Sequence, residues 1–583
     1  MSARAAAVLG VWIAASALMF AQLPSDIEIR KILAERVGAE NRGIAIVVGI
    51  VDQNGRRVIS YGSVARNDPR KLDGNTVFEI GSMTKVFTSL VLMDMARHGE
   101  VSVTDPVSKY LPANVKVPER DGRKITLADL STQSSGLPRM PTNFHPKDPD
   151  NPYADYSVQQ MYDFLSGYEL TRDPGAQYEY SNLAVGLLGH VLSLRAGMSY
   201  EAMVRSRICD PLGMKDTRVT LTPEMKARLA EGHSGAGTPV PNWDLPTLAG
   251  AGALRSTAND MLTFLAANLG YVKTPLAQDM ADEVSIRRPT TIPDTQIAYA
   301  WHIQNAKDGS SILWHNGGTG GYRSYMGYDP KARVGVVALT NISTVEGADD
   351  LGRHLLNPAY PLSKIAPPAE HTEITLDSKI LGRYVGTYRL SPYTLLLVSR
   401  DGERLSMRLG PQKIPIFAES ERSFFVKVVD AQLTFDVDAQ GAATGVTLHQ
   451  NGANTVAKRL TGEEIERANA EIEAHKAEVA KRFKDQTPEP GSEASVRKAM
   501  EELRSGNVEY NRMSPGLAAA TRQQLAGIQS MLAELGALQS VTFKRVLQNG
   551  ADVYEVKFEH GSLEYTIVLG PNGIVQGAGL RRE

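Results

Sequence analysis

The sequence predicts an α+β protein of several domains, and three patterns along the chain support this class. The first 360 residues open and close with strand signals that enclose a long stretch of helix and loop. Residues 384–460 consist of short alternating segments separated by turns, which indicates a small β-barrel. Residues 494–583 pass from helical spacing to strand signals, which indicates a small α+β domain. The length of 583 residues agrees, because it exceeds what one hydrophobic core supports.

The first unit starts with a helix and a hairpin. Asp26 to Val37 has helical spacing, and the strand signals of 44–61 surround an Asn-Gly pair, which is a strong hairpin turn signal. A short strand, 77–80, then leads into Ser82, after which apolar residues recur at helical spacing until Gly99. Ser82 is therefore expected to open a buried helix.

The remaining segments complete the expected organisation. Residues 104–299 are rich in Pro, Gly and Asn, which favours a mostly helical subdomain with long connections. Strand signals return at 298–339 and finish the sheet, and a helical stretch follows at 345–356. The expected boundaries are an export segment 1–21, a main domain 22–360, a linker 361–375, a β-barrel 376–461, a charged helix and linker 462–492, and an α+β domain 493–583.

Composition excludes several classes of protein. Lysine and arginine number 63 against 65 acidic residues, so the net charge of -2 gives no long-range field that would attract nucleic acid. Hydrophobic residues at 42% and charged residues at 22% are ordinary for a globular protein and argue against disorder or a multi-span membrane protein. Cys209 is the one cysteine, so neither an intrachain disulfide nor a cysteine metal cluster is expected.

The N-terminus resembles a signal peptide. Arg4 precedes an apolar run from Ala5 to Ala21, which ends at a polar, proline-containing segment. An uncleaved membrane anchor is the alternative, because Met19 is a poor residue three positions before a break after Ala21. Either reading places the rest of the chain in the periplasm or outside the cell.

Ser82 and Lys85 form an S-x-x-K pair, whose spacing puts a hydroxyl and an amine on one helix face. A lysine activates a serine hydroxyl only when burial or nearby charge lowers the pKa of its amine. The helix N-terminus adds a backbone N–H and a favourable dipole for a developing oxyanion. The pair alone is a weak signal, because serine is a common N-cap and a second copy, Ser495 to Lys498, lies in a polar helix with no strand before it.

Two further motifs are ambiguous when taken singly. Tyr180 and Asn182 form the only Y-x-N in the chain; a phenol beside a lysine relays protons, and an amide orients the lysine and a substrate carbonyl. A buried tyrosine and a helix cap would explain the same letters. His315 ends a strand before a run of glycines that allows close approach of backbone to a ligand, although an ordinary glycine-rich hairpin loop would do the same.

The three motifs in this order resemble the signature of the serine β-lactamase and penicillin-binding-protein superfamily, which is S-x-x-K, then S-D-N or Y-x-N, then K-T-G. With tyrosine as the first residue of its second motif, the sequence resembles the class C β-lactamase-like branch of this superfamily, which includes D-amino-acid peptidases and esterases. The resemblance covers residues 25–360 and implies an antiparallel sheet flanked by helices plus a helical subdomain. Residues 384–460 look like the lipocalin-like barrel of some of these peptidases, and 494–583 are faintly similar to domains of the nuclear-transport-factor-2 type.

Carried over to this sequence, the resemblance implies a role for each matching residue. Ser82 would attack the substrate carbonyl, and Lys85 and Tyr180 would share the base and acid roles. Asn182 would help to place the substrate. The implied oxyanion hole is the backbone N–H of Ser82 and that of Gly318.

One departure concerns the third motif, where K-T-G has become His315-Asn316-Gly317. A lysine there would be a permanent cation for a substrate carboxylate, whereas histidine is largely neutral at pH 7. The change argues against strong β-lactamase activity and resembles the esterase and D-peptidase members. His315 and Gly317 are still expected to help orient the substrate.

Together these signals predict an exported serine hydrolase that forms an acyl-enzyme on D-amino-acid-containing peptides or small esters, without metal or cofactor. A weak class C β-lactamase and an inactive binder of peptidoglycan fragments are the alternatives. A metallohydrolase is disfavoured, because the histidines show no H-x-x-x-H or H-x-H spacing. The expected partner is a small-molecule or peptide substrate, and a membrane only if the N-terminal segment is uncleaved. The β-barrel is expected to border the cleft and limit substrate size; the alternative is that the C-terminal domains serve only in packing or oligomer contacts.

Overall fold

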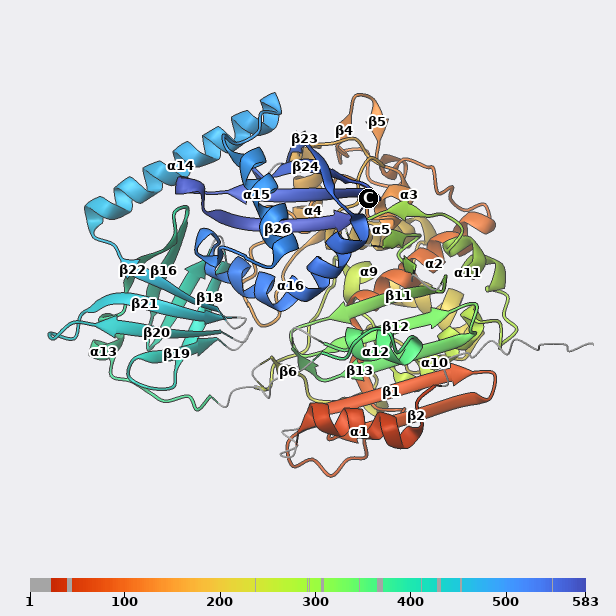
Figure 1. Cartoon of the computed structure of the whole chain (residues 1–583). Coiled ribbons are helices and arrows are strands. Elements are labelled where there is room, and N and C mark those ends of the chain that lie inside the picture. The colour runs from red at the N-terminus through yellow and green to blue at the C-terminus, as the bar shows by residue number, and fades with distance from the viewer. Residues whose placement is uncertain are drawn as a thin grey trace, which may run out of the picture.

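The computed structural model describes residues 23–582, apart from 39–43, 236, 291, 293, 306–308, 345–346, 364–370, 410–411, 427–430, 451–452 and 548. The predicted export segment and the middle of the predicted linker lie outside the described residues. Among the residues that are described, no helix is both long and apolar enough to cross a membrane. Figure 1 shows three parts: the main domain on the right, a β-barrel on the left and an α+β domain above.

An eight-stranded antiparallel sheet forms the centre of the main domain, in the order β2-β1-β13-β12-β11-β10-β9-β8. Val47 of β1 lies opposite Leu339 of β13, so strands from the two ends of the domain pair at its centre. This confirms the predicted sheet. The strands are β1 (Ala45–Asp52), β2 (Gly55–Gly62), β8 (Arg288–Pro289), β9 (Thr295–Ile297), β10 (His302–Asn305), β11 (Ser311–Gly318), β12 (Arg323–Asp329) and β13 (Val334–Thr340).

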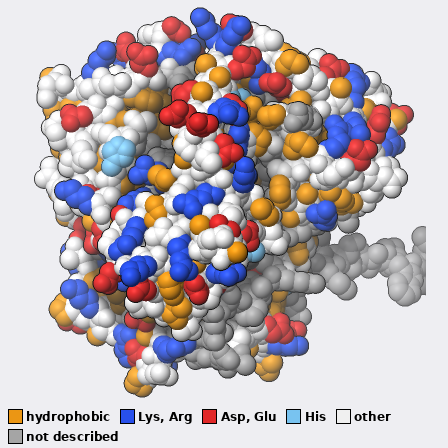
Figure 2. Space-filling view, turned by 90° about the vertical axis from the view of Figure 1, so that its left-hand side faces the viewer, with side chains coloured by type: hydrophobic (Ala, Val, Ile, Leu, Met, Phe, Trp, Pro, Cys, Tyr) orange, Lys and Arg blue, Asp and Glu red, His pale blue; other side chains and the backbone are white. Residues whose placement is uncertain are grey.

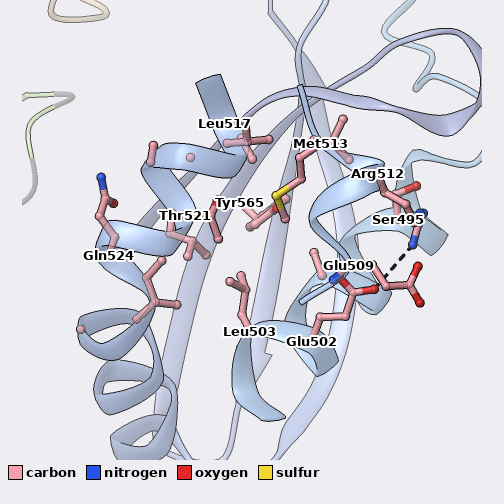
Figure 3. A pocket seen from close by; sticks show the side chains of 18 of the residues that line it. Ser495, Glu502, Leu503, Glu509, Arg512, Met513, Leu517, Thr521, Gln524 and Tyr565 are labelled. Carbon is pink, nitrogen blue, oxygen red and sulfur yellow. Dashed lines mark hydrogen bonds and ion pairs between the residues drawn. The ribbon is translucent and has the colours of Figure 1, made fainter. Parts of the chain in front are cut away.

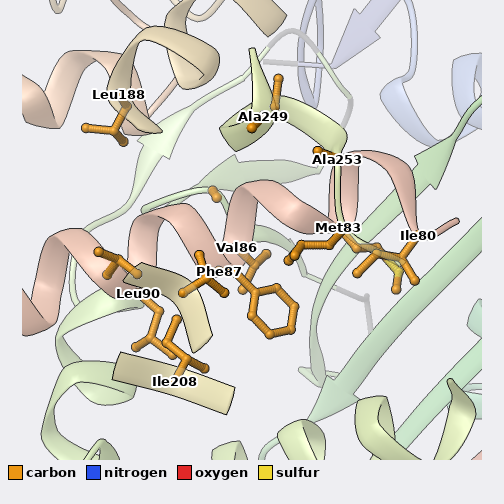
Figure 4. Close-up of a cluster of buried hydrophobic side chains, with 14 of the residues drawn as sticks. Ile80, Met83, Val86, Phe87, Leu90, Leu188, Ile208, Ala249 and Ala253 are labelled. Atoms are coloured by element: carbon orange, nitrogen blue, oxygen red, sulfur yellow. The ribbon is translucent and has the colours of Figure 1, made fainter. Parts of the chain in front are cut away.

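Helices cover both faces of this sheet. On one face, α1 and α12 pack through Leu33 and Leu351 in a cluster with strand side chains. On the other face, α10 lies on β1 and β13, and α2 is buried along almost its whole length, with Val86, Phe87 and Leu90 in the main core (Figure 4). The helices named here are α1 (Asp26–Val37), α2 (Thr84–Arg97), α10 (Ala258–Asn268) and α12 (Asp349–Leu356).

The segment between the two halves of the sheet is mostly helical, as predicted. Its helices are α3 (Leu127–Ser131), α4 (Val158–Gly167), α5 (Asn182–Ala196), α6 (Tyr200–Val204), α7 (Asp210–Leu212), α8 (Pro223–Ala227), α9 (Ala249–Gly252) and α11 (Ala277–Glu283), with η1 (Gly81–Met83), η2 (Val107–Lys109) and η3 (Arg205–Cys209). Small strands complete it: β3 (Val77–Glu79), β4 (Glu119–Arg120), β5 (Arg123–Lys124), β6 (His233–Ser234), β7 (Arg255–Thr257) and β14 (Ile342–Ser343).

The predicted strand before Ser82 is present as β3, which pairs with β7 in a separate two-stranded sheet. One strand prediction was wrong in detail: the strand expected from 298 begins only at His302, because the chain turns at Ala300, where φ is +64°. The difference does not change the predicted fold class.

A closed barrel of eight strands follows the main domain, which confirms the predicted β-barrel. Its interior is filled by buried side chains such as Tyr388, Leu433 and Phe435. The elements are α13 (Ser378–Gly382), β15 (Gly386–Ser391), β16 (Thr394–Asp401), β17 (Arg404–Leu409), β18 (Gln412–Ala418), β19 (Ser423–Val426), β20 (Ala431–Val437), β21 (Ala443–Gln450) and β22 (Ala453–Arg459).

The charged helix α14 connects the barrel to the last domain. His475 of α14 stacks on Tyr393 of the barrel with ring centroids 3.6 Å apart, and Arg482 forms a buried ion pair with Asp552 of the last domain. The last domain packs two long helices on a four-stranded sheet. Its elements, with α14, are α14 (Gly462–Asp485), α15 (Ser492–Ser505), η4 (Tyr510–Arg512), α16 (Pro515–Leu535), β23 (Leu538–Val546), β24 (Asp552–Phe558), β25 (Gly561–Leu569), η5 (Pro571–Gly573) and β26 (Val575–Arg582).

Basic and acidic side chains are interspersed over the face drawn in Figure 2, which agrees with the net charge of -2. Such a distribution produces no large field of one sign.

Candidate active site

Ser82 lies in the single turn η1 between strand β3 and helix α2. Gly81 makes this turn possible: its φ is +49°, and a Cβ there would lie 2.7 Å from the backbone nitrogen of Gly318. A Cβ at Gly317 would lie 2.0 Å from the carbonyl oxygen of Ile80. The glycines therefore let the end of β11 run directly against the turn that carries Ser82.

Lys85 lies one helical turn further on and is fully buried. Its Nζ lies 2.9 Å from Ser82 Oγ, 2.9 Å from Asn182 Oδ1 and 2.6 Å from the carbonyl oxygen of Ala251. Burial, assisted by the positive charge of Arg139, holds the pKa of Lys85 well below its ordinary value. A neutral amine has two hydrogens for Asn182 and Ala251, which leaves its lone pair for the proton of the Ser82 hydroxyl.

Tyr180 lies beside this pair, with its ring centroid 4.9 Å from Lys85 Nζ. Arg139 lies on the same ring, its Cζ 5.1 Å from the centroid. Burial raises the pKa of Tyr180 to about 12, although a hydrogen bond with Ser82 and the charge of Arg139 both act in the opposite direction. At neutral pH the phenol therefore keeps its proton and is placed to donate it.

Asn182 is held between the lysine and an aromatic wall. Its Nδ2 donates to Tyr153 Oη at 3.1 Å, while its Oδ1 accepts from Lys85. Ser181, and not Asn182, caps helix α5, since its side chain accepts from the backbone N–H of Ala184 at 2.9 Å. The Asn182 side chain is therefore not used for capping and faces the site.

His315 lies behind the cavity and does not line it. Its Nδ1 donates to the carbonyl oxygen of Asn316 at 2.6 Å, so that Nε2 is unprotonated, and Nε2 is buried with no hydrogen-bond partner among the described residues. Its ring lies 6.4 Å from that of Tyr180. Burial, together with the neighbouring His302 and Lys85, holds the pKa of His315 well below its ordinary value, so His315 supplies no cation at neutral pH.

A cavity of about 470 Å³ opens in front of Ser82 and is lined by residues from five parts of the chain, within 81–82, 139–153, 180–182, 243–252 and 316–323. Ser82 and Gly318 lie on its wall, where both residues of the implied oxyanion hole are expected. Among the described residues that line it, Arg139 and Arg323 are charged and none is acidic. Arg323 is held by three backbone carbonyl groups, whereas no ion pair is formed by Arg139 among the described residues.

The structure therefore brings together Ser82, Lys85, Tyr180 and Asn182, and it adds residues that sequence reasoning missed. The added residues are Arg139, Tyr153, Trp243, Ala251 and Arg323. Arg139 directly follows residues 130–138, Leu-Ser-Thr-Gln-Ser-Ser-Gly-Leu-Pro, which are similar to sequences of the superfamily that the three motifs resemble. That similarity is the one signal that could have drawn attention to Arg139. Within the described part of the chain, no three His, Cys, Asp or Glu side chains gather as a metal site would require.

Comparisons with known proteins agree with this geometry. The family model described as Beta-lactamase matches residues 29–358, and a Domain of unknown function (DUF3471) matches residues 370–466. The second match carries no function, so the lipocalin-like character of the barrel stays a prediction.

Two curated relatives and one solved structure illustrate the proteins to which this chain is similar. The D-alanyl-D-alanine-carboxypeptidase/endopeptidase AmpH of Escherichia coli (strain K12) is 32% identical over 320 residues, covering 52% of this chain and 81% of AmpH. Penicillin-binding protein 4* of Bacillus subtilis (strain 168) is 26% identical over 425 residues, covering 69% of this chain and 91% of that protein. The octameric penicillin-binding protein homologue from Pyrococcus abyssi shares the fold, with a TM-score of 0.50 at 20% identity over 74% of this chain and 99% of its own. The chain is thus a serine hydrolase and belongs to the Beta-lactamase family.

Proposed function

We propose that this protein hydrolyses amide bonds in D-amino-acid-containing peptides through an acyl-enzyme on Ser82. The observation that carries the proposal is the hydrogen bond of 2.9 Å between Ser82 Oγ and the buried amine of Lys85, whose pKa is held well below its ordinary value. A neutral amine at this distance is a competent general base for the hydroxyl.

In the acylation step, Lys85 takes the hydroxyl proton of Ser82 as Oγ bonds to the carbonyl carbon. The carbonyl π electrons move to oxygen and give a tetrahedral oxyanion, which the backbone N–H groups of Ser82 and Gly318 stabilise. Each such donor contributes on the order of 3 kcal/mol to the transition state. Tyr180 then protonates the leaving nitrogen as the carbon–nitrogen bond breaks, and the proton on Lys85 passes to Tyr180.

Deacylation uses the same groups in reverse order. A water molecule loses a proton to the relay while its oxygen attacks the ester carbonyl, and Ser82 Oγ leaves and recovers its proton. The raised pKa of Tyr180, about 12, suits a group that donates a proton and is then reprotonated by Lys85. The relay should contribute about 10²- to 10⁴-fold in rate.

The charge of the cavity supports a substrate with a free carboxylate. His315 is neutral and buried, so it does not take the place of the family lysine as a cation. Arg139 and Arg323 line the cavity, none of its described lining residues is acidic, and either guanidinium can pair with a carboxylate of a peptide. AmpH, which shares 32% identity, is named a carboxypeptidase and endopeptidase for D-alanyl-D-alanine, in agreement with such a substrate.

Labelling with a fluorophosphonate probe, followed by intact-protein mass spectrometry, tests the nucleophile. Wild type should gain one adduct, Ser82→Ala should gain none, and Ser495→Ala, which alters the second S-x-x-K copy, should label like wild type. Absence of an adduct on folded wild type would support an inactive binding protein instead.

A substrate panel tests the substrate class. Diacetyl-L-Lys-D-Ala-D-Ala should be hydrolysed with a higher kcat/KM than its C-terminal amide, and the difference should shrink in Arg139→Met and Arg323→Met. Faster turnover of p-nitrophenyl acetate or of a penicillin than of every peptide would favour the esterase or β-lactamase reading.

We also propose that the chain is exported through its N-terminal apolar segment. The mass of the protein recovered from its native host or from an export-competent one tests this, since cleavage after Ala21 gives a mature chain that begins at Gln22. An intact N-terminus in the membrane fraction would favour an anchor.

A further inference from the structure

A second cavity, of about 310 Å³, lies in the C-terminal α+β domain and shares no residue with the catalytic cavity. It is lined by residues of helices α15 and α16, the turn η4 and strands β25 and β26, it opens to solvent beside Gln524 and Gly527, and Figure 3 shows side chains from both helices facing it. Most of its wall is apolar, with Leu503, Met513, Leu517 and Ile528 among the lining residues. Cavities of this volume and character are typical of small-molecule sites.

The cavity is not explained by loose packing of the domain. Side chains beneath it, such as Val496, Leu532 and Val556, are fully buried in a continuous core. Protein interiors of this density seldom leave voids much larger than a water molecule. An apolar wall also offers few hydrogen bonds to water, so an organic ligand is the better occupant.

Polar groups with unused hydrogen-bonding capacity gather at one side of the cavity. Glu502 Oε1 is buried and has no hydrogen-bond partner among the described residues; the nearest cations, Lys498 and Arg512, lie 3.6 and 3.7 Å away. The hydroxyl of Tyr565, a lining residue, likewise forms no hydrogen bond with the described residues. Two acids, Glu502 and Glu509, balance the two cations, so this side carries no net charge.

We propose that this cavity binds an uncharged, largely apolar small molecule that donates an N–H or O–H hydrogen bond to Glu502 Oε1. The apolar wall recognises the body of the ligand, and Glu502 Oε1, which accepts no hydrogen bond from the described residues, recognises its donor. A charged ligand would disturb the balance of the two ion pairs that surround Glu502 and would lose solvation in the apolar part. The site is independent of the reaction at Ser82.

The probe for the test is N-phenyl-1-naphthylamine, which is neutral, mostly apolar and carries one N–H. Its fluorescence on titration with the full chain should show saturable binding, unchanged when Ser82 is blocked with a fluorophosphonate. Ala578→Phe should weaken binding at least tenfold, because Ala578 lines the cavity and its side chain lies on the same face of the sheet as those of the lining residues Tyr565 and Leu580. Gly516→Phe is the control, since its side chain would meet nothing within 4 Å and lies outside the lining, and it should bind like wild type.

A pair of probes tests the hydrogen bond. Glu502→Leu should bind N-phenyl-1-naphthylamine about tenfold or more weakly, because a hydrogen bond to a charged acceptor is lost. It should bind the N-methyl derivative, which lacks the N–H, as wild type does. If Ala578→Phe fails to fold, as judged by circular dichroism, Ala520→Phe fills the cavity from the helix α16 side and should show the same loss. Absence of saturable binding to wild type, equal binding by a folded filled variant, or equal effects of Glu502→Leu on both probes would overturn the proposal.

Discussion

Replacing Arg139 by methionine should move the acid limb of the pH–rate profile to higher pH. The positive charge of Arg139 disfavours the protonated form of Lys85 and so lowers its pKa. Loss of that charge raises the pKa, so a smaller fraction of Lys85 is neutral at any given acidic pH. Since the neutral amine is the proposed base, kcat/KM then reaches its plateau at a higher pH.

The size of this shift follows from the geometry. Arg139 Cζ lies 5.1 Å and Lys85 Nζ 4.9 Å from the ring centroid of Tyr180, so the two cations are at most about 10 Å apart. At that separation an effective dielectric constant between 20 and 80 gives about 0.4 to 1.7 kcal/mol, or about 0.3 to 1.2 pH units. Arg139 is solvent-exposed, so screening favours the lower half of that range.

The assay uses p-nitrophenyl acetate, which has no carboxylate for Arg139 to bind. A change in kcat/KM then reflects the pKa of Lys85 and not a lost contact between Arg139 and the substrate. Arg139→Lys keeps the charge and should restore the wild-type profile. Arg333→Met is a matched control, because Arg333 also lies over a tyrosine ring, that of Tyr271 at 4.5 Å, and does not line the catalytic cavity. An unchanged acid limb in Arg139→Met would refute the electrostatic coupling.

Three further substitutions test the rest of the site. Lys85→Met should lower the rate of fluorophosphonate labelling by about 10²- to 10⁴-fold, because it removes the base, and circular dichroism should show a folded chain. Gly81→Ala should abolish labelling and lower the free energy of unfolding by more than the 1–2 kcal/mol typical of a left-handed residue, since its Cβ also meets backbone at 2.7 Å. Gly99→Ala is the control, because φ there is +71° and a Cβ would meet nothing within 4 Å. In urea titrations it should show only the loss of free energy of unfolding that comes from the left-handed backbone, and it should label like wild type. Tyr153→Phe should lower kcat/KM up to about tenfold, because Asn182 Nδ2 loses its acceptor, and an unchanged value would show that this hydrogen bond does not position the amide.

The sequence predicted the architecture and those site contacts that join residues close together in the chain. The Asn-Gly turn specified the first hairpin, and the glycine-bounded helical spacing after Ser82 specified helix α2. The strand at 298 was predicted too long because no local letter shows that Ala300 adopts a positive φ. The second S-x-x-K copy, in the last domain, matches the first in sequence but is not part of a comparable site.

What the sequence by itself determined is that Ser82 and Lys85 lie on one face of the chain where it turns into a helix, because residues at an i, i+3 spacing are neighbours there. Only the tertiary structure decided that the lysine is neutral, since its pKa depends on complete burial and on Arg139 beyond the helix. Asn182 meets Lys85 across 97 positions of sequence, and Ala251 does so across 166. Contacts of that range depend on how whole elements pack, and no short motif encodes them.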